Sequence, residues 1–130
     1  MATTKTVRRQ TVRRQTGLHH PVSVYAKQVV RGKLHDQCGP YEIAACQRHL
    51  DDLKRQGTKN FPFVFDTTRA DRIIRWFGQC IQVRGVEQRE AIQLQPWQIF
   101  DLGCTYGWVH KDTGARRFKR TYNMRARGNF

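Results

Sequence analysis

The residue best suited to recognition chemistry is Gln98, in the run Leu94-Gln95-Pro96-Trp97-Gln98-Ile99-Phe100. Pro96 suits the first turn of a helix, where the backbone N–H groups have no partner in any case, so Gln98 is expected one turn into that helix. A glutamine side chain offers both a donor and an acceptor, as reading the edge of an adenine ring requires. A glutamine on an amphipathic helix is also often only solvated, and both interpretations stay open.

Four cations follow a predicted turn further along the chain: Arg116, Arg117, Lys119 and Arg120. Lys111-Asp112-Thr113-Gly114 is typical of a hairpin turn in which glycine supplies a positive φ. Trp108–Val109 is then predicted to pair with Phe118–Lys119 or their neighbours, which brings the four cations together. Three interpretations compete: a nucleic-acid surface with salt-dependent phosphate contacts, part of a nucleotide pocket, or a charged strand edge that discourages aggregation.

A strand is predicted after this turn, because Phe118, Arg120, Tyr122, Met124 and Ala126 alternate with Lys119, Thr121 and Asn123. The run ends in Gly128-Asn129. A strand that enters a glycine-containing turn is how phosphate-binding loops begin, since backbone N–H groups can then point at an anion. No Lys-Ser or Lys-Thr pair follows, so we expect such a loop to lack its phosphate-gripping half.

The cysteines predict neither disulfides nor a metal centre. Cys38, Cys46, Cys80 and Cys104 form no Cys-x-x-Cys pair, which favours a reduced, intracellular protein with free buried thiols. A zinc site built on Cys38, Cys46 and His49 matches no standard ligand spacing. The longest apolar runs, such as Phe61–Phe65, are too short to cross a bilayer.

Charge divides the chain. Lys and Arg number 24 against 10 Asp and Glu, a surplus of +14 that is typical of proteins with a polyanionic partner. Residues 1–20 contain no acid and carry the tandem repeat Thr6–Gln10 and Thr11–Gln15, which predicts a disordered basic tail. We expect a helical region over 21–83, a linker over 84–93 and a second unit over 94–130.

About four helices are predicted. Helical spacing and terminal signals place them over roughly 22–31, from Pro40 to just before Gly57, after the N-cap Asp66, and from Pro96 onward. Arg69, Arg72 and Arg75 form a stripe on the third helix, for which a solvated surface is favoured over a DNA-binding one. Phe61–Phe65 is expected to be an extended connector because Pro62 cannot continue a central strand. The fold class is therefore α+β, helices followed by a hairpin and strand.

The second unit resembles the entry to the ATPase domain of the large terminase subunit of tailed bacteriophages. In that family a Leu-x-Pro-Trp-Gln segment precedes Phe-Gly-Trp, an Arg-Arg-Phe-Arg strand and a phosphate loop of the form Ala-Arg-Lys-Asn-Gly-Lys-Ser. This chain has, in the same order, Leu94-Gln95-Pro96-Trp97-Gln98, Tyr106-Gly107-Trp108, Arg116-Arg117-Phe118-Lys119 and Ala126-Arg127-Gly128-Asn129. Segments 24–33 and 46–53 also resemble the family's N-terminal part, so the resemblance extends from about His20 to Phe130.

The resemblance implies an incomplete P-loop ATPase, whose sheet the C-terminal hairpin and strand would open. Gln98 would recognise adenine, Arg127 would contact the γ-phosphate as a catalytic residue, and Gly128 and Asn129 would supply loop backbone. Gly128 replaces the family's lysine, and Phe130 stands where a glycine is common. The parent protein would use ATP and Mg²⁺ to drive double-stranded DNA into a procapsid and would cut it with a nuclease domain.

The resemblance also implies partners and a place. The parent would assemble as an oligomer on the portal protein with the small terminase subunit, in the host cytoplasm and without a membrane. The 130 residues themselves are expected to be an N-terminal fragment, inactive because the Walker A lysine, the Walker B acids and the nuclease domain are missing, and to bind no cofactor tightly. The alternative is a small non-catalytic basic protein that binds DNA or RNA.

Overall fold

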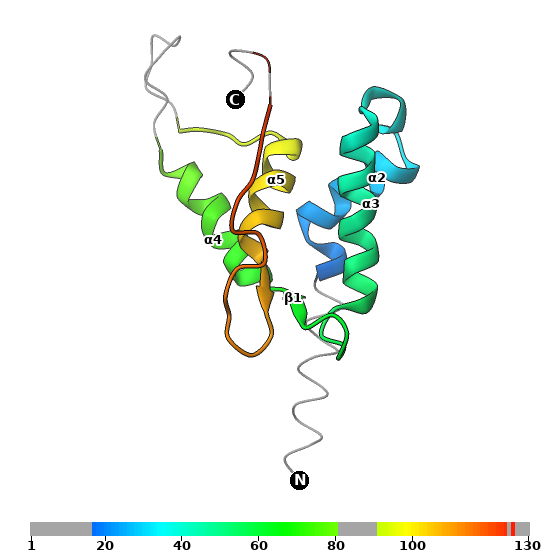
Figure 1. Ribbon diagram of the computed structural model, residues 1–130. Helices are drawn as coiled ribbons and strands as arrows, with labels where there is room; N and C mark the ends of the chain where they lie inside the picture. Colours follow the sequence, from blue (N-terminus) through cyan, green and yellow to red (C-terminus); the bar gives the residue numbers. More distant parts are fainter. Residues whose placement is uncertain (1–16, 81–90, 125, 127–130) are drawn as a thin grey trace.

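The structure is a computed structural model that describes residues 17–80, 91–124 and 126. Its elements are α2 (Pro21–Arg31), the 3-10 helix η1 (His35–Gln37), α3 (Pro40–Arg55), β1 (Phe63–Phe65), α4 (Thr67–Gly78), α5 (Pro96–Gly107) and β2 (Trp108–His110). The protein is thus mixed α+β, with helices and a small two-stranded antiparallel sheet (Figure 1). No helix within the described ranges has both the length and the apolar character needed to cross a membrane.

The helices begin where the sequence predicts. Pro21 and Pro40 occupy the first turns of α2 and α3. Asp66 caps α4 by accepting hydrogen bonds from the backbone N–H groups of Thr68 and Arg69, at 3.0 and 3.3 Å. Gly57 follows α3 with a φ of 72°, the left-handed conformation in which glycine avoids a Cβ clash. The predicted helical pattern is confirmed at these ends.

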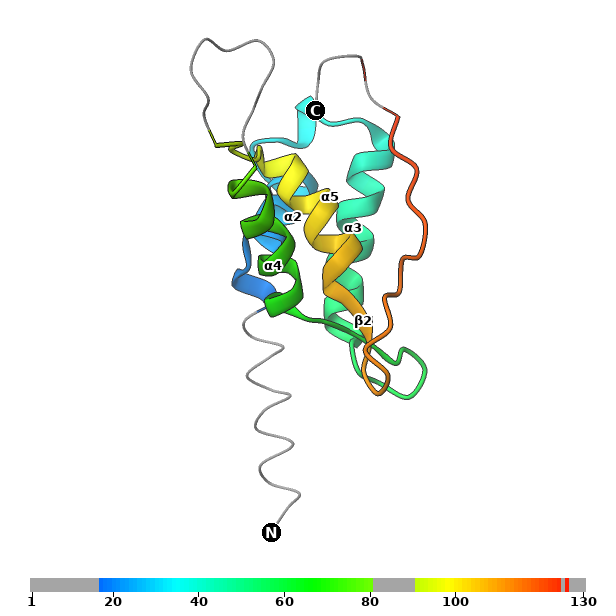
Figure 2. The ribbon, with the colours of Figure 1, turned by 90° about the vertical axis from the view of Figure 1, so that its left-hand side faces the viewer.

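Helix α5 is the central element (Figure 2). It packs against α4 on one side and α2 on the other, while α2 packs on α3. One core cluster joins Val22, Ala26 and Val29 of α2 to Phe100 of α5 and to Trp108 of β2. The expected helical region and the expected second unit therefore share a hydrophobic core, although most of the predicted linker between them lies outside the described residues.

The sheet differs from the prediction. β1 pairs with β2 in the register Phe63↔His110, Val64↔Val109 and Phe65↔Trp108, so part of the predicted connector is a strand. Pro62 does not prevent this pairing, because it precedes the strand and only its carbonyl is used, by Lys111 N–H at 2.8 Å. A proline is tolerated at such a position.

The predicted hairpin forms, but the long strand after it does not. Gly114 has a φ of 69°, as expected for the turn, and Val109 forms a bridge with Arg116, two residues earlier than the expected partner Phe118. From Phe118 to Met124 the chain has no regular secondary structure, and residues 119–124 are exposed. The alternating pattern there was misleading, since neither set of side chains beyond Phe118 faces a core.

Helix α5 approaches its neighbours closely at two glycines. A Cβ on Gly107 would come within 2.6 Å of Phe65 Cε2, and one on Gly103 would overlap Val22 Cγ2. Val22 is fully buried, so moving it away from a Cβ would displace its packed neighbours. The α2–α5 crossing therefore requires the absence of a side chain at Gly103.

Replacing Gly103 with alanine is expected to destabilise the protein by about 1–3 kcal/mol, because the added methyl overpacks the contact with Val22. At a helix position without a close neighbour, replacing glycine with alanine is stabilising by up to about 1 kcal/mol. Gly78→Ala is the matched control, since nothing lies within 4 Å of its Cβ position. Urea denaturation of the two variants checks this, and a Gly103→Ala protein as stable as the control would show that the helices can move apart.

Candidate functional site

Gln98 lies in the first turn of α5, as predicted, and is only 7% exposed. Its side-chain Oε1 accepts a hydrogen bond from the backbone N–H of Gln95 at 2.7 Å. This bond satisfies one of the N–H groups that a helix start leaves without an intrahelical partner. The amide acceptor is thus engaged within the protein, and an adenine would have to compete for it.

The four hairpin cations do not form one surface. Arg116 is exposed, and its guanidinium lies 5.0 Å from the ring centre of Tyr106 in α5. Lys119 and Arg120 are exposed on the irregular segment that follows. Arg117 points into the protein, and its side chain is 17% exposed. Of the residues predicted to bind nucleic acid, Arg117 is therefore the one committed to an internal contact.

Arg117 is held by a carboxylate and by aromatic rings. Its Nη1 donates to Asp52 Oδ2 at 2.5 Å. Its guanidinium lies within 6 Å of four ring centres, those of Phe61, Phe63, Trp108 and Phe118. A guanidinium over aromatic faces is attracted by the ring quadrupoles, and this attraction is strongest where water is excluded. The residue therefore fastens the hairpin to α3.

Asp52 is the hub of this contact, with a side chain 2% exposed. Arg55 donates to its Oδ1 from Nε at 2.9 Å and from Nη2 at 2.6 Å. Asp51, the preceding residue, accepts hydrogen bonds from Gln47 and Lys54 on the surface. A buried carboxylate between two arginines is stabilised only while both remain in place.

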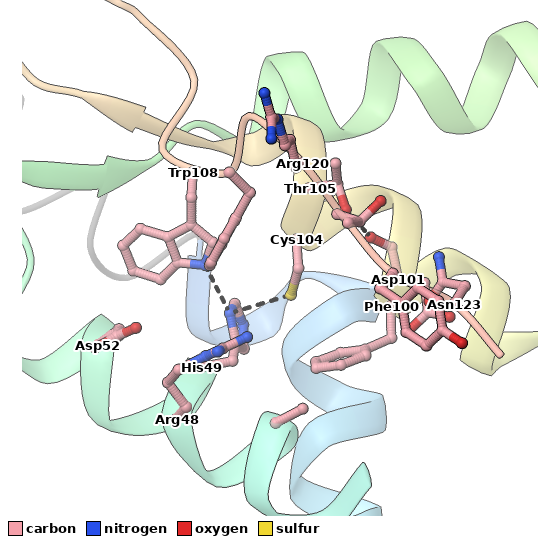
Figure 3. A pocket seen from close by; sticks show the side chains of 14 residues that line it. Arg48, His49, Asp52, Phe100, Asp101, Cys104, Thr105, Trp108, Arg120 and Asn123 are labelled. Atoms are coloured by element: carbon pink, nitrogen blue, oxygen red, sulfur yellow. Dashed lines mark hydrogen bonds between the residues drawn. The ribbon is translucent and has the colours of Figure 1, made fainter. Parts of the chain in front are cut away.

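A cavity of about 310 Å³ lies beside this cluster, between α3, α5 and residues 118–123. Figure 3 shows Asp101, Thr105 and Cys104 entering it from α5, Arg48 and His49 from α3, and Arg120 and Asn123 from the terminal segment. Phe118 closes one side, with the Arg48 guanidinium 5.1 Å from its ring centre. The lining carries positive, negative and aromatic groups.

His49 forms the inner wall of this cavity and is 2% exposed. Its Nδ1 accepts from the indole N–H of Trp108 at 3.1 Å, and Cys104 Sγ lies 3.6 Å from the same nitrogen (Figure 3). Because an indole N–H can only donate, the ring proton sits on Nε2, which faces Ser23 Oγ at 2.9 Å. The serine hydroxyl in turn donates to the carbonyl of Gly17.

These groups are held in their neutral forms. Burial lowers the pKa of His49 from its ordinary 6.5 to about 4, and Asp52 only partly opposes that shift. Burial likewise raises the pKa of the Cys104 thiol well above its usual range and that of Cys46 to about 12. A neutral imidazole beside a protonated thiol is the opposite of an activated cysteine nucleophile. His49 and its partners Trp108, Cys104 and Ser23 are therefore assigned a structural role and not a catalytic one.

Arg127, Gly128 and Asn129, predicted to contact phosphate, lie outside the described residues. All four cysteines are free, as predicted, but their predicted burial is complete only for Cys46, because Cys38, Cys80 and Cys104 are half-buried as whole residues. Within residues 17–80 and 91–124, no group of three His, Cys, Asp or Glu side chains is arranged to hold a metal ion.

Sequence reasoning missed the roles of His49 and Asp52. Both lie on α3 within the predicted amphipathic pattern, but their partners Trp108 and Arg117 are 59 and 65 residues away. A polar residue one helical turn from an apolar stripe is the only local signal, and it does not specify the partner.

No protein-family model, curated protein or solved structure matches the chain.

Proposed function

We propose that the chain is the N-terminal part of a phage terminase large subunit, an ATP-driven motor that packages double-stranded DNA and cuts it. The observation that carries this proposal is the order of its motifs: Leu94–Gln98, Tyr106–Trp108, Arg116–Lys119 and Ala126–Asn129. The proposal is supported by the continuity of the first two motifs, because α5 starts at the first motif and runs directly into β2 at the second. The hairpin then returns the third motif to Trp108 through the bond from Arg117 N–H to the Trp108 carbonyl, at 2.9 Å.

In this proposal the hairpin opens a P-loop ATPase sheet. Gln98 reads the adenine after exchanging its bond with Gln95 for one to the nucleotide, and Arg127 contacts the γ-phosphate while Gly128 and Asn129 offer backbone N–H groups. The parent protein binds ATP with Mg²⁺ and acts in the host cytoplasm, as an oligomer on the portal protein with the small terminase subunit.

Only the exposed cations of the hairpin stay as candidates for binding DNA or nucleotide. Arg117 is excluded from direct contact with DNA or nucleotide, since its guanidinium is engaged by Asp52 and four rings. Arg116, Lys119 and Arg120 keep their exposed positions and stay as candidates. Any anion at the hairpin would thus meet three cations and not four.

The test begins with the DNA beyond the codon for Phe130. We expect the reading frame to continue within a few codons into Lys-Ser or Lys-Thr, and the protein so extended to hydrolyse ATP. In that protein Gln98→Ala is expected to lose its preference for ATP over GTP, by about 10-fold or more, because the amide reads the base. If Gln98 serves only to cap the start of α5, Gln98→Ala would lower the melting temperature without changing the ATP to GTP ratio.

Gln93→Ala is the matched control, an exposed glutamine just before α5. It should leave both the ATP to GTP ratio and the melting temperature unchanged. A stop codon directly after Phe130 would overturn the proposal, as would a Gln98→Ala protein with the original nucleotide preference.

A further inference from the structure

A second concave surface shares no lining residue with the cavity beside His49. It is an open hollow of about 500 Å³ between α4, α5 and the hairpin, lined by Arg69, Arg72, Ile73, Trp76, Tyr106 and Arg116. The four residues from α4 follow the spacing i, i+3, i+4, i+7, which puts them on one face of the helix. Arg75, the third member of the predicted arginine stripe, is not part of the lining. We call this surface the arginine–tryptophan hollow.

The hollow is a built feature, because its walls are tied together. Arg69 Nη1 donates to the carbonyl of Gly114 at 2.8 Å, which joins α4 to the tip of the hairpin. On the opposite wall the Arg116 guanidinium lies 5.0 Å from the ring centre of Tyr106. Three arginines and two aromatic rings thus reach one place from three elements that are distant in the sequence.

The charges of the hollow favour an anion. Asp66 Oδ2 lies 3.9 Å from Arg69 Nε, and Asp71 is paired with Nε2 of His20 at 2.9 Å. Among the described residues, no carboxylate lies within 4 Å of the guanidinium nitrogens of Arg72 or Arg116. Two of the three cations are therefore available to a ligand. A planar guanidinium binds phosphate oxygens with paired hydrogen bonds.

The aromatic side chains specify the ligand further. Trp76 is 56% exposed and Tyr106 is 37% exposed, so the hollow presents aromatic surface to solvent beside its cations. Exposed aromatic rings next to arginines are the arrangement on which unpaired bases stack while their phosphates meet positive charge. In a duplex the base faces are covered by their neighbours, and only phosphates and groove edges are accessible. An apolar protein partner would have to desolvate Arg72 and Arg116 without neutralising them.

We propose that the arginine–tryptophan hollow binds single-stranded DNA, with a base stacked on Trp76 and the adjoining phosphates held by Arg72 and Arg116. The choice of DNA as the polymer rests on the proposed function, whereas stacking and charge pairing follow from the hollow itself. Arg69 keeps its bond to Gly114 and positions the hairpin wall. Gln98 is not among the residues that line this surface.

The test uses the 130-residue chain and a fluorescently labelled 12-nucleotide oligothymidylate, with binding followed by anisotropy. Trp76→Ala is expected to weaken binding by about 5-fold to 100-fold, the range for loss of one stacking ring. Trp76→Phe keeps an aromatic face and should stay within about 3-fold of the original chain. Arg72→Ala together with Arg116→Ala should weaken binding. The slope of log binding constant against log salt concentration should become shallower by roughly 1.4, because each lost phosphate contact to a single strand accounts for about 0.7.

Two controls separate the hollow from the general positive charge of the chain. Tyr41→Ala removes an aromatic ring that is 91% exposed on α3, away from the hollow, and should leave binding unchanged. Arg31→Ala with Lys59→Ala removes two exposed cations outside it and should weaken binding less than the Arg72 and Arg116 pair. A 12-base-pair duplex should bind with no penalty from Trp76→Ala.

Three results would overturn the proposal. The first is equal single-strand affinity for Trp76→Ala and the original chain, and the second is an equal loss of affinity for the Arg72 and Arg116 pair and the Arg31 and Lys59 pair. The third is tighter binding of 12-nucleotide oligouridylate than of oligothymidylate. None of them bears on the reading frame or on the ATP to GTP ratio. The two proposals can therefore fail separately.

Discussion

Asp52→Ala is expected to lower the free energy of unfolding by about 3–5 kcal/mol, the largest effect of any single substitution proposed for this protein. The carboxylate is 2% exposed and accepts hydrogen bonds from Arg55 and Arg117. Its removal leaves the Arg117 guanidinium, 17% exposed, with rings around it and no anion. Chemical denaturation monitored by circular dichroism measures the change.

The neighbouring aspartate provides the control for this prediction. Asp51→Ala removes an exposed carboxylate that accepts from Gln47 and Lys54, and it should leave stability nearly unchanged. The double variant Asp52→Ala with Arg117→Met should recover part of the loss, because it removes the unpaired charge together with its former partner. If Asp52→Ala and Asp51→Ala unfold at the same denaturant concentration, the contacts of Asp52 with Arg55 and Arg117 contribute nothing to stability.

Acid is expected to destabilise the protein through His49, by about 3 kcal/mol between pH 7 and pH 4. Burial lowers the pKa of this histidine to about 4 in the folded chain, against an ordinary 6.5. Between these two values the unfolded chain binds a proton at His49 and the folded chain does not. The free energy of unfolding therefore rises with pH through this window, and the contribution is fully present above pH 6.5.

Denaturation at a series of pH values measures this dependence. His49→Gln is expected to be less stable at pH 7, because it disturbs the bonds to Ser23 and Trp108, but to lose less stability than the original chain as the pH falls. His19→Gln replaces an exposed histidine and should keep the original acid sensitivity. Parallel pH profiles for the original and His49→Gln proteins would show that protonation elsewhere dominates acid unfolding.

The helices could be predicted because their signals are local. A proline at the first turn, an aspartate cap before Thr67 and an apolar stripe at helical spacing each act within a few residues, and α2, α3 and α4 follow them closely. A local signal was misleading at β1, because Pro62 predicted a connector where a strand begins one residue later. Another was misleading after Phe118, where alternation of side chains had no core to face.

The sites could be predicted only in part, because their contacts are not local. The position of Gln98 in the first turn of α5 was predicted from Pro96, but its hydrogen bond with Gln95 could not be predicted from the sequence. The arginine stripe on α4 was noticed, yet only the packing of α4 beside α5 and the hairpin adds Tyr106 and Arg116 to Arg69 and Arg72. The burial of Arg117 likewise depends on Asp52, 65 residues earlier.

The pairing of β1 with β2 has a consequence for how the chain acquires its structure. The two strands flank α4 and α5 in the sequence, whereas α2 and α3 pack as near neighbours along the chain. Closing a long segment costs chain entropy before pairing returns any free energy, so the sheet is expected to form late. During synthesis Phe63–Phe65 remains without its partner strand until Trp108–His110 has left the ribosome, and in that interval the nascent polypeptide is most open to aggregation.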